Sequence, residues 1–103
     1  MSTPFSITAS VHESTADVTV IGEIDPATVG TFSTVLLTLV AEGVDHFVID
    51  ASGVTFVDST AIHALQTVLH AGEDTRVTLS GATHRLLDLL LATGMDTLIT
   101  IAP

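Results

Sequence analysis

Apolar and polar residues alternate along this chain in two periods, and the order of these periods predicts its secondary structure. Residues 5–11 alternate apolar with hydroxyl side chains, which is the period-two pattern of a half-exposed edge strand. Residues 17–21 form a second β-type segment, close enough in sequence to pair with the first as a hairpin. The chain is therefore expected to begin with two antiparallel strands.

Helical spacing begins after Asp25 and Pro26. Asp25 is placed to be the N-cap, and Pro26 suits the first turn because its missing N–H is no loss there. Gly43 is the expected end of this helix. Five apolar residues share one stripe that should pack on a sheet: Val29, Phe32, Leu36, Leu39 and Val40.

The next segment changes period part-way through. Residues 46–51 are an apolar run typical of a buried strand, and Ser52 and Gly53 are expected to end it. Residues 54–57 are then expected to be a connector to the following helix.

Asp58 or Ser59 should cap that helix, and Gly72 should end it. Periodicity divides its side chains into a core set (Ile62, Leu65 and Leu69) and a set that faces solvent or a partner (His63, Gln66 and His70).

Three more elements complete the pattern. Residues 76–80 should form a strand, Thr83 should cap a last helix that ends at Gly94, and residues 96–101 should form the final strand. The last helix has four leucines on its expected buried side: Leu86, Leu87, Leu90 and Leu91.

The order ββαβαβαβ predicts an α/β fold with a mixed five-stranded sheet, in which the first strand is antiparallel to the rest. Parallel strands joined by right-handed crossovers in one direction put their helices mainly on one face. Hydroxyl residues alternate along the first and fourth strands, which suits a sheet with one open face. With 103 residues, the chain has the size of a single domain, residues 1–103.

The charge balance narrows the possible partners. Twelve acidic residues are set against only Arg76 and Arg85, giving a formal net charge of −10. Nucleic acids and anionic membranes are bound through clustered Lys and Arg, so this balance argues against both. Two explanations of the acidity stay open: a basic protein partner, and the solubility of a hydrophobic chain.

The chain has no cysteine, which excludes disulfides and thiolate metal sites. Residues 1–5 lack the basic and apolar regions of a signal peptide. The longest nearly apolar run, residues 35–41, is far shorter than the roughly 20 residues of a membrane span. We therefore expect a cytoplasmic protein without membrane insertion.

Ser59 is the candidate functional residue. The first turn of a helix has unpaired N–H groups and a partial positive charge, so a hydroxyl there is a favourable place for an anion. Asp25 and Asp58 follow neighbouring strands and are expected on one rim of the sheet with Ser59. The alternative is that these residues only cap their helices.

Catalytic and metal-binding interpretations have less support. Ser59 and His63 lie four residues apart beside Asp58, but a hydrolase also needs a nucleophile elbow and an oxyanion hole, and no G-x-S-x-G motif occurs. His63 and His70 lack an HExxH pattern and a clear third ligand. We therefore expect no enzymatic activity, no metal and no cofactor.

Residues 50–65 resemble the signature of the STAS domain of anti-sigma factor antagonists, in which an aspartate and a serine follow a strand. Ala61 stands where the family usually has Gly, and His63 where it often has a small residue. Residues 22–25, 84–88 and 93–95 resemble further segments of the family. The matching positions of the signature are Asp50, Phe56, Val57, Asp58, Ser59, Thr60 and Ile62.

The resemblance implies a bacterial regulator of transcription, active in stress responses, whose unphosphorylated form binds an anti-sigma factor and frees the sigma factor. The anti-sigma factor would be a serine kinase that phosphorylates Ser59, and a phosphatase would reverse the reaction. The implied partner-binding residues are Asp25, Asp58, Ser59, Thr60 and His63. A monomer or weak dimer is expected. The alternative is a STAS subunit of a larger assembly, for lipid transport or as a stress-signalling scaffold, that works without phosphorylation.

Overall fold

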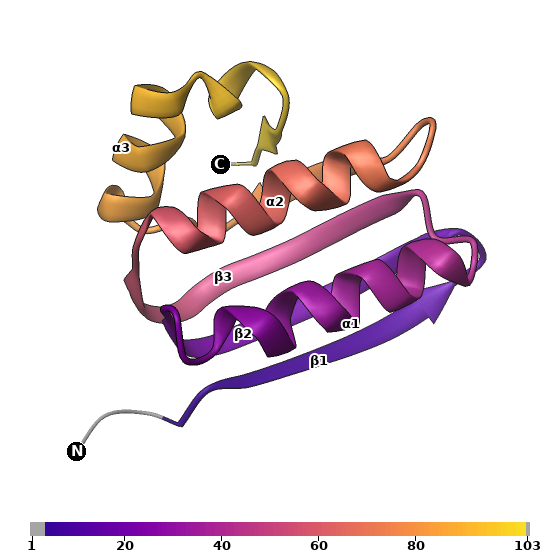
Figure 1. Ribbon diagram of the computed structural model, residues 1–103, viewed down its shortest axis with the longest axis horizontal. Helices are drawn as coiled ribbons and strands as arrows, with labels where there is room; N and C mark the ends of the chain where they lie inside the picture. Colours follow the sequence, from indigo (N-terminus) through magenta and orange to yellow (C-terminus); the bar gives the residue numbers. More distant parts are fainter. Residues whose placement is uncertain (1–3, 103) are drawn as a thin grey trace.

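The structure is a computed structural model that describes residues 4–102. Residues 1–3, part of the segment expected not to be a signal peptide, and residue 103 lie outside the described residues. After an opening hairpin, helices and strands alternate (Figure 1). In chain order the elements are β1 (Ser6–His12), β2 (Thr15–Ile24), α1 (Val29–Ala41), β3 (His46–Val57), α2 (Ser59–Ala71), β4 (Arg76–Ser80), α3 (His84–Thr93), the 3-10 helix η1 (Met95–Thr97) and β5 (Thr100–Ile101).

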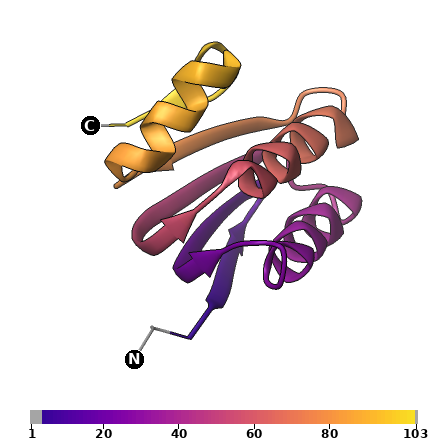
Figure 2. The same ribbon diagram turned by 60° about the vertical axis from the view of Figure 1, so that its left-hand side comes forward.

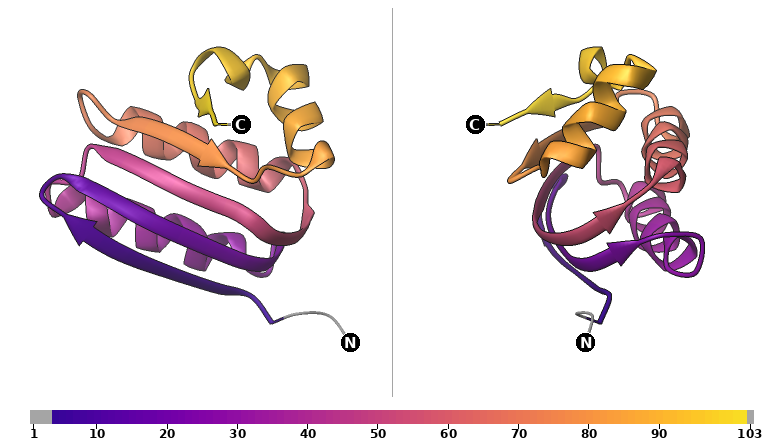
Figure 3. Two further views of the ribbon diagram at one scale, coloured as in Figure 1. Left: turned by 180° about the vertical axis from the view of Figure 1, so that it is seen from behind. Right: turned by 90° about the vertical axis from the view of Figure 1, so that its left-hand side faces the viewer.

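The five strands form one sheet in the order β1-β2-β3-β4-β5. β1 pairs antiparallel with β2, and every other neighbouring pair is parallel, as the sequence predicts. Helices α1 and α2 lie side by side over one face of the sheet (Figures 1 and 2). Seen from behind, the strands have no helix over them, so the second face is open (Figure 3). This confirms the expected one-sided covering.

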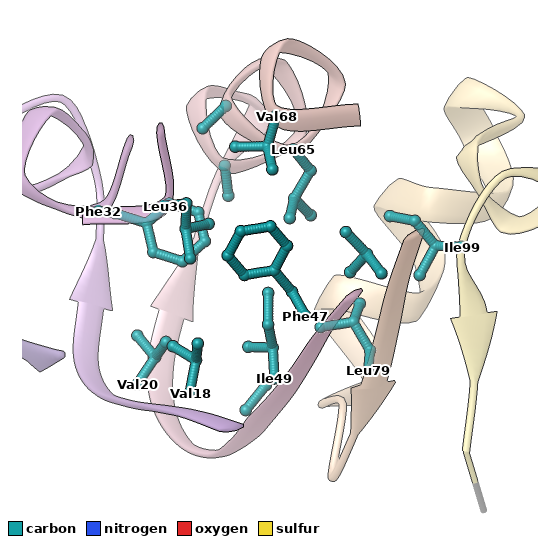
Figure 4. Packing of buried hydrophobic residues seen from close by; sticks show 14 of the residues in the cluster. Val18, Val20, Phe32, Leu36, Phe47, Ile49, Leu65, Val68, Leu79 and Ile99 are labelled. Atoms are coloured by element: carbon teal, nitrogen blue, oxygen red, sulfur yellow. The ribbon is translucent and has the colours of Figure 1, made fainter. Parts of the chain in front are cut away.

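The hydrophobic core lies between the covered face of the sheet and the helices. Along β2, Ala16, Val18 and Val20 are buried, whereas the residues between them are exposed on the open face. The ring of Phe47, on β3, points toward the helices and lies between α1 and α2 (Figure 4). The alternation of burial along the strands therefore follows from one face being covered and the other open.

The predicted helix stripes are confirmed for α1 and α2. Phe32 and Leu36 of α1 are buried, and the other three members of its stripe are partly buried against the core. On α2, Ile62 and Leu65 are buried and Leu69 is partly buried, whereas the predicted outward set is exposed.

The stripe on α3 was only partly right. Leu86 and Leu90 are buried and Leu87 is half-buried, but Leu91 is 63% exposed, and the partly buried leucine that packs against the core is Leu89. α3 is a ten-residue helix that reaches the core along the line of Leu86 and Leu90, which are four residues apart. One residue further on, Leu91 is turned about 100° around the helix axis and faces outward.

β3 is longer than predicted, because Ser52 and Gly53 do not end it. The register with β2 shifts twice, between Thr19 and Ile21 and between Gly22 and Glu23, so β3 takes up two extra residues as bulges. The Ile21 side chain lies 3.0 Å from the place that a Cβ of Gly53 would occupy. Gly53 thus permits a close approach inside a strand, and the expected connector at residues 54–57 is a strand instead.

Three other predicted boundaries were also wrong. β2 spans Thr15–Ile24, beyond the predicted residues 17–21 at both ends. Asp25 is not the N-cap of α1, which begins at Val29 after a turn at residues 26–28. Most of the final strand expected at residues 96–101 is absent, because Gly94 adopts a left-handed conformation (φ 76°) and η1 follows it. Only Thr100–Ile101 pairs with β4.

Candidate functional site at the carboxyl end of the sheet

Asp25 and Asp58 lie on the same edge of the sheet. Each directly follows a strand, and the last residues of those two strands, Ile24 and Val57, are partners in the parallel register of β2 and β3. The carboxyl ends of parallel strands share one edge, and ligands of α/β proteins commonly bind there. The structure therefore brings the two aspartates and the start of α2 together, in the arrangement that the sequence predicts.

Asp58, and not Ser59, is the N-cap of α2. Its backbone is extended (φ −131°, ψ −171°), and its Oδ1 accepts the backbone N–H of Thr60 at 2.9 Å. The Thr60 hydroxyl also donates to Asp58 Oδ1. The carboxylate and the threonine hydroxyl are thus both used in starting the helix.

Ser59 is the first residue of α2, and its side chain is exposed. Within residues 4–102, its hydroxyl makes no hydrogen bond, whereas the hydroxyl of half-buried Thr60 is bound to Asp58. A reactant approaching from solvent therefore meets the hydroxyl of Ser59 at an accessible helix start, beside unpaired N–H groups of the first turn.

Asp25 organises the turn between β2 and α1. Its Oδ1 accepts the N–H groups of Ala27 at 2.9 Å and Thr28 at 3.1 Å. The Thr28 hydroxyl in turn donates to the carbonyl of Glu23 at 2.7 Å. These bonds hold Asp25 in a half-buried position and give the turn beside Ser59 a defined shape.

A shallow groove of about 310 Å³ runs between α1 and α2 and begins beside the Ser59 turn. Its lining comes from both helices: Val29, Ser33, Thr60, His63, Ala64 and Thr67. The groove adds Val29 and Ser33 to the predicted surface. Sequence reasoning missed both because no local pattern shows which residues of one helix face the neighbouring helix.

Phe56 is a further residue that the structure adds to the predicted surface. It is 49% exposed near the end of β3, two residues before Asp58. Aromatic side chains that are exposed in a free protein commonly become buried at the centre of its interface with a partner. The match of Phe56 to the family signature could have pointed to this residue. Because residues 54–57 were expected to be a connector, the sequence did not predict an exposed ring on a strand.

Asp50, which also matches the signature, lies on β3 before the first bulge and has a structural role. The side chain of Ser52 donates to its Oδ1 at 2.7 Å, and the backbone N–H of Ser52 donates at 2.9 Å. The hydrogen bond from the Ser52 side chain, and to a smaller extent the one from its backbone, lower the pKa of Asp50 because they favour its charged form. Asp50 thus supports the backbone of β3 where the bulges begin.

Within residues 4–102, no group of three or more His, Asp or Glu side chains is arranged to hold a metal ion. No helix in the same residues is long and apolar enough to cross a membrane.

The chain thus folds as an α/β sheet covered on one face by helices, with an exposed serine at the start of its second helix. The family model of the STAS domain matches residues 6–103, so the chain is a member of the STAS domain family. Comparison with functionally curated proteins finds no match.

Solved structures with the same fold include several anti-sigma factor antagonists. One from Mycobacterium paratuberculosis is 24% identical, with a TM-score of 0.85 over 97% of this chain and 86% of that one. The antagonist SpoIIAA in its unphosphorylated form is 16% identical, with a TM-score of 0.81 over 97% and 89%. The phosphorylated form of SpoIIAA, a Bacillus cell fate determinant, is also 16% identical, with a TM-score of 0.75 over 97% and 92%. These similarities show a shared fold.

Proposed function

We propose that this protein is an anti-sigma factor antagonist, a non-enzymatic regulator that works in the bacterial cytoplasm. Its unphosphorylated form binds an anti-sigma factor that has serine kinase activity, which frees a sigma factor for transcription. Phosphorylation of Ser59 by the same kinase releases the antagonist, and a phosphatase restores it. The observation that carries this proposal is the exposed, unbonded hydroxyl of Ser59 on a rim with Asp25 and Asp58.

The proposed chemistry suits Ser59 better than Thr60. In the transfer, Ser59 Oγ attacks the γ-phosphorus of ATP held by the kinase, its proton passes to a base of the kinase, and ADP leaves. Thr60 would first have to give up its hydrogen bond to Asp58, and its side chain is half-buried. The free hydroxyl one residue earlier is therefore the better acceptor.

The proposed docking surface surrounds Ser59. It combines Phe56 with the groove between α1 and α2, which contains Thr60 and His63. Apolar rings together with polar groups are the ordinary composition of a protein interface. The net charge of −10 would speed the approach of a basic partner surface.

A phosphate on Ser59 would act mainly on the partner. It adds roughly −1.5 to −2 charges beside the Asp58 carboxylate, while the N-terminal end of α2 offsets only about 0.3–1 kcal/mol of this cost. The exposed phosphate is thus tolerated by the fold, but it places charge and bulk where the partner docks. Release of the partner follows from this local change.

The test is incubation of the purified protein with ATP and candidate anti-sigma factor kinases. Intact mass should rise by one phosphate, Ser59→Ala should abolish the gain, and Thr60→Ala should keep it because the N–H of residue 60 remains for the cap. A phosphate on another residue, or normal modification of Ser59→Ala, would refute the assignment.

Binding gives an independent measurement. Ser59→Ala should retain the affinity of the unphosphorylated protein for the kinase, whereas Ser59→Glu should weaken it, although Glu reproduces only part of the charge of a phosphate. A stable complex that forms without any phosphorylation, and that Ser59→Glu leaves intact, would instead support a STAS subunit of a larger assembly.

A further inference from the structure

We propose that His63 is the intramolecular partner of a phosphate on Ser59, holding it against the first turns of α2. This inference rests on the proposed function, because it concerns the phosphorylated form. It adds a positioning residue at a position where the family signature often has a small side chain.

The geometry of α2 supports the pair. Ser59 and His63 are four residues apart within one helix, which places their side chains on the same face about 6 Å apart along the axis. Side chains in a helix lean toward its N-terminus, so the His63 ring covers the turn that begins at Ser59. The His63 ring is therefore within reach of a phosphate on Ser59.

Both side chains are available for this contact. Ser59 and His63 are exposed, and within residues 4–102 neither side chain makes a hydrogen bond. His63 lines the groove between the two helices, beside Thr60 and Ala64. The ring can therefore turn toward Ser59 without breaking a hydrogen bond.

The charged groups near a phosphate on Ser59 are mainly negative, so a nearby cation would be stabilising. A phosphate on Ser59 would join the carboxylates of Asp58 and Asp25 on this rim, and the chain has no lysine. α1, which packs against α2, has no titratable side chain between Val29 and Ala41. On α2 itself, the only titratable side chains are His63 and His70.

Within residues 4–102, the other cationic groups at this edge of the sheet are His84 and Arg85, at the start of α3. α3 packs on the opposite side of α2 from α1 (Figure 1). Within α2, His70 is two turns beyond His63, and its ring Nδ1 is already 2.8 Å from the carbonyl oxygen of Gln66. His63 is thus the cation-forming side chain of α2 nearest to Ser59, and His70 is its matched control.

In the phosphorylated state, the His63 ring then partly neutralises the charge of the phosphate on Ser59. When the imidazole takes up a proton from solvent, it donates an N–H to a phosphate oxygen, as charge-assisted pairs do. The phosphate then has a fixed position over the groove and competes there with a docked partner. The strength of the switch depends on pH in the range where imidazole and the second phosphate proton both titrate, roughly pH 6–7.

The experiment installs phosphoserine at position 59 of the full chain during translation, so that no kinase is needed. NMR then follows the ring protons of the histidines and the phosphorus resonance as the pH is varied. The titration midpoint of His63 should be about one unit higher in the phosphorylated chain than in the unmodified one, from Coulomb attraction across about 5 Å of solvent-exposed space. The midpoint of His70 should move much less.

Three variants of the phosphorylated chain complete the test. His63→Gln should raise the midpoint of the phosphorus titration, whereas His70→Gln and Arg85→Gln should leave it unchanged. Equal shifts of His63 and His70, or an identical phosphorus titration in His63→Gln and the parent, would overturn the inference. An effect of Arg85→Gln in place of His63→Gln would do the same. Because the phosphate is installed directly, a failed kinase reaction would count against the proposed function alone.

Discussion

The substitution Leu65→Ala tests whether α2 meets the sheet through the buried stripe described above. Leu65 is only 2% exposed and lines a small enclosed apolar cavity of about 10 Å³ with residues of the sheet and of α1 and α3. The substitution removes three buried carbon groups, and at about 0.8 kcal/mol for each the loss of hydrophobic stabilisation is about 2.4 kcal/mol. The vacated space would join the existing cavity, which adds about 24 cal/mol for each Å³ that does not collapse.

We therefore expect Leu65→Ala to lower the free energy of unfolding by about 3–5 kcal/mol. The total for a domain of this kind is roughly 5–15 kcal/mol, so the loss should shift the urea midpoint strongly. Leu91→Ala is the matched control, since Leu91 is also helical but 63% exposed, and it should change stability by no more than about 0.5 kcal/mol. Equal urea midpoints for the two variants would show that the α2 interface is wrongly assigned.

Three further substitutions test local features. Ala61→Gly, which restores the usual family residue, should cost about 1–2 kcal/mol in urea unfolding, because Ala61 is buried in α2 and glycine disfavours helix; no loss would mean that the methyl group packs poorly. Thr83→Ala should cost about 1 kcal/mol in the same assay, because the hydroxyl accepts the N–H of Leu86 at 3.2 Å, whereas unchanged stability would exclude a capping role. The folded-state pKa of Asp50 is lowered by Ser52, so its contribution to stability is fully present above the unfolded pKa of 3.8 and is lost as the pH falls through the lower folded pKa. Asp50→Asn should therefore flatten the acid end of a stability-against-pH curve, and an unaltered curve would contradict this.

The starts and ends of two helices could be predicted from single residues. Asp58 and Thr83 make the expected capping hydrogen bonds, and Gly94 has the left-handed conformation that ends α3. These features depend on interactions between residues at most four apart, so a short stretch of sequence contains the whole cause. The same locality placed the hydroxyl of Ser59 at the start of a helix.

The extent of β3 could not be predicted in this way. Ser52 and Gly53 have the local features of a turn, yet the pairing with β2 continues past them through two bulges. The hydrogen bonds that keep these residues in a strand are made to a chain segment about thirty residues earlier. Local preference was therefore overridden by a partner that only the assembled sheet provides.

The same distinction between local and long-range causes applies to the candidate site. The sequence alone determined the type of fold, the accessible serine at the start of a helix and the acidic residues beside it, because periodicity and capping are local properties. Only the tertiary structure decided that Asp58 binds Thr60 and leaves Ser59 free, that Phe56 is exposed, and that Val29 and Ser33 of α1 complete a groove with α2. Those features depend on how helices and strands distant in sequence pack against one another, and packing geometry is set by the whole core at once.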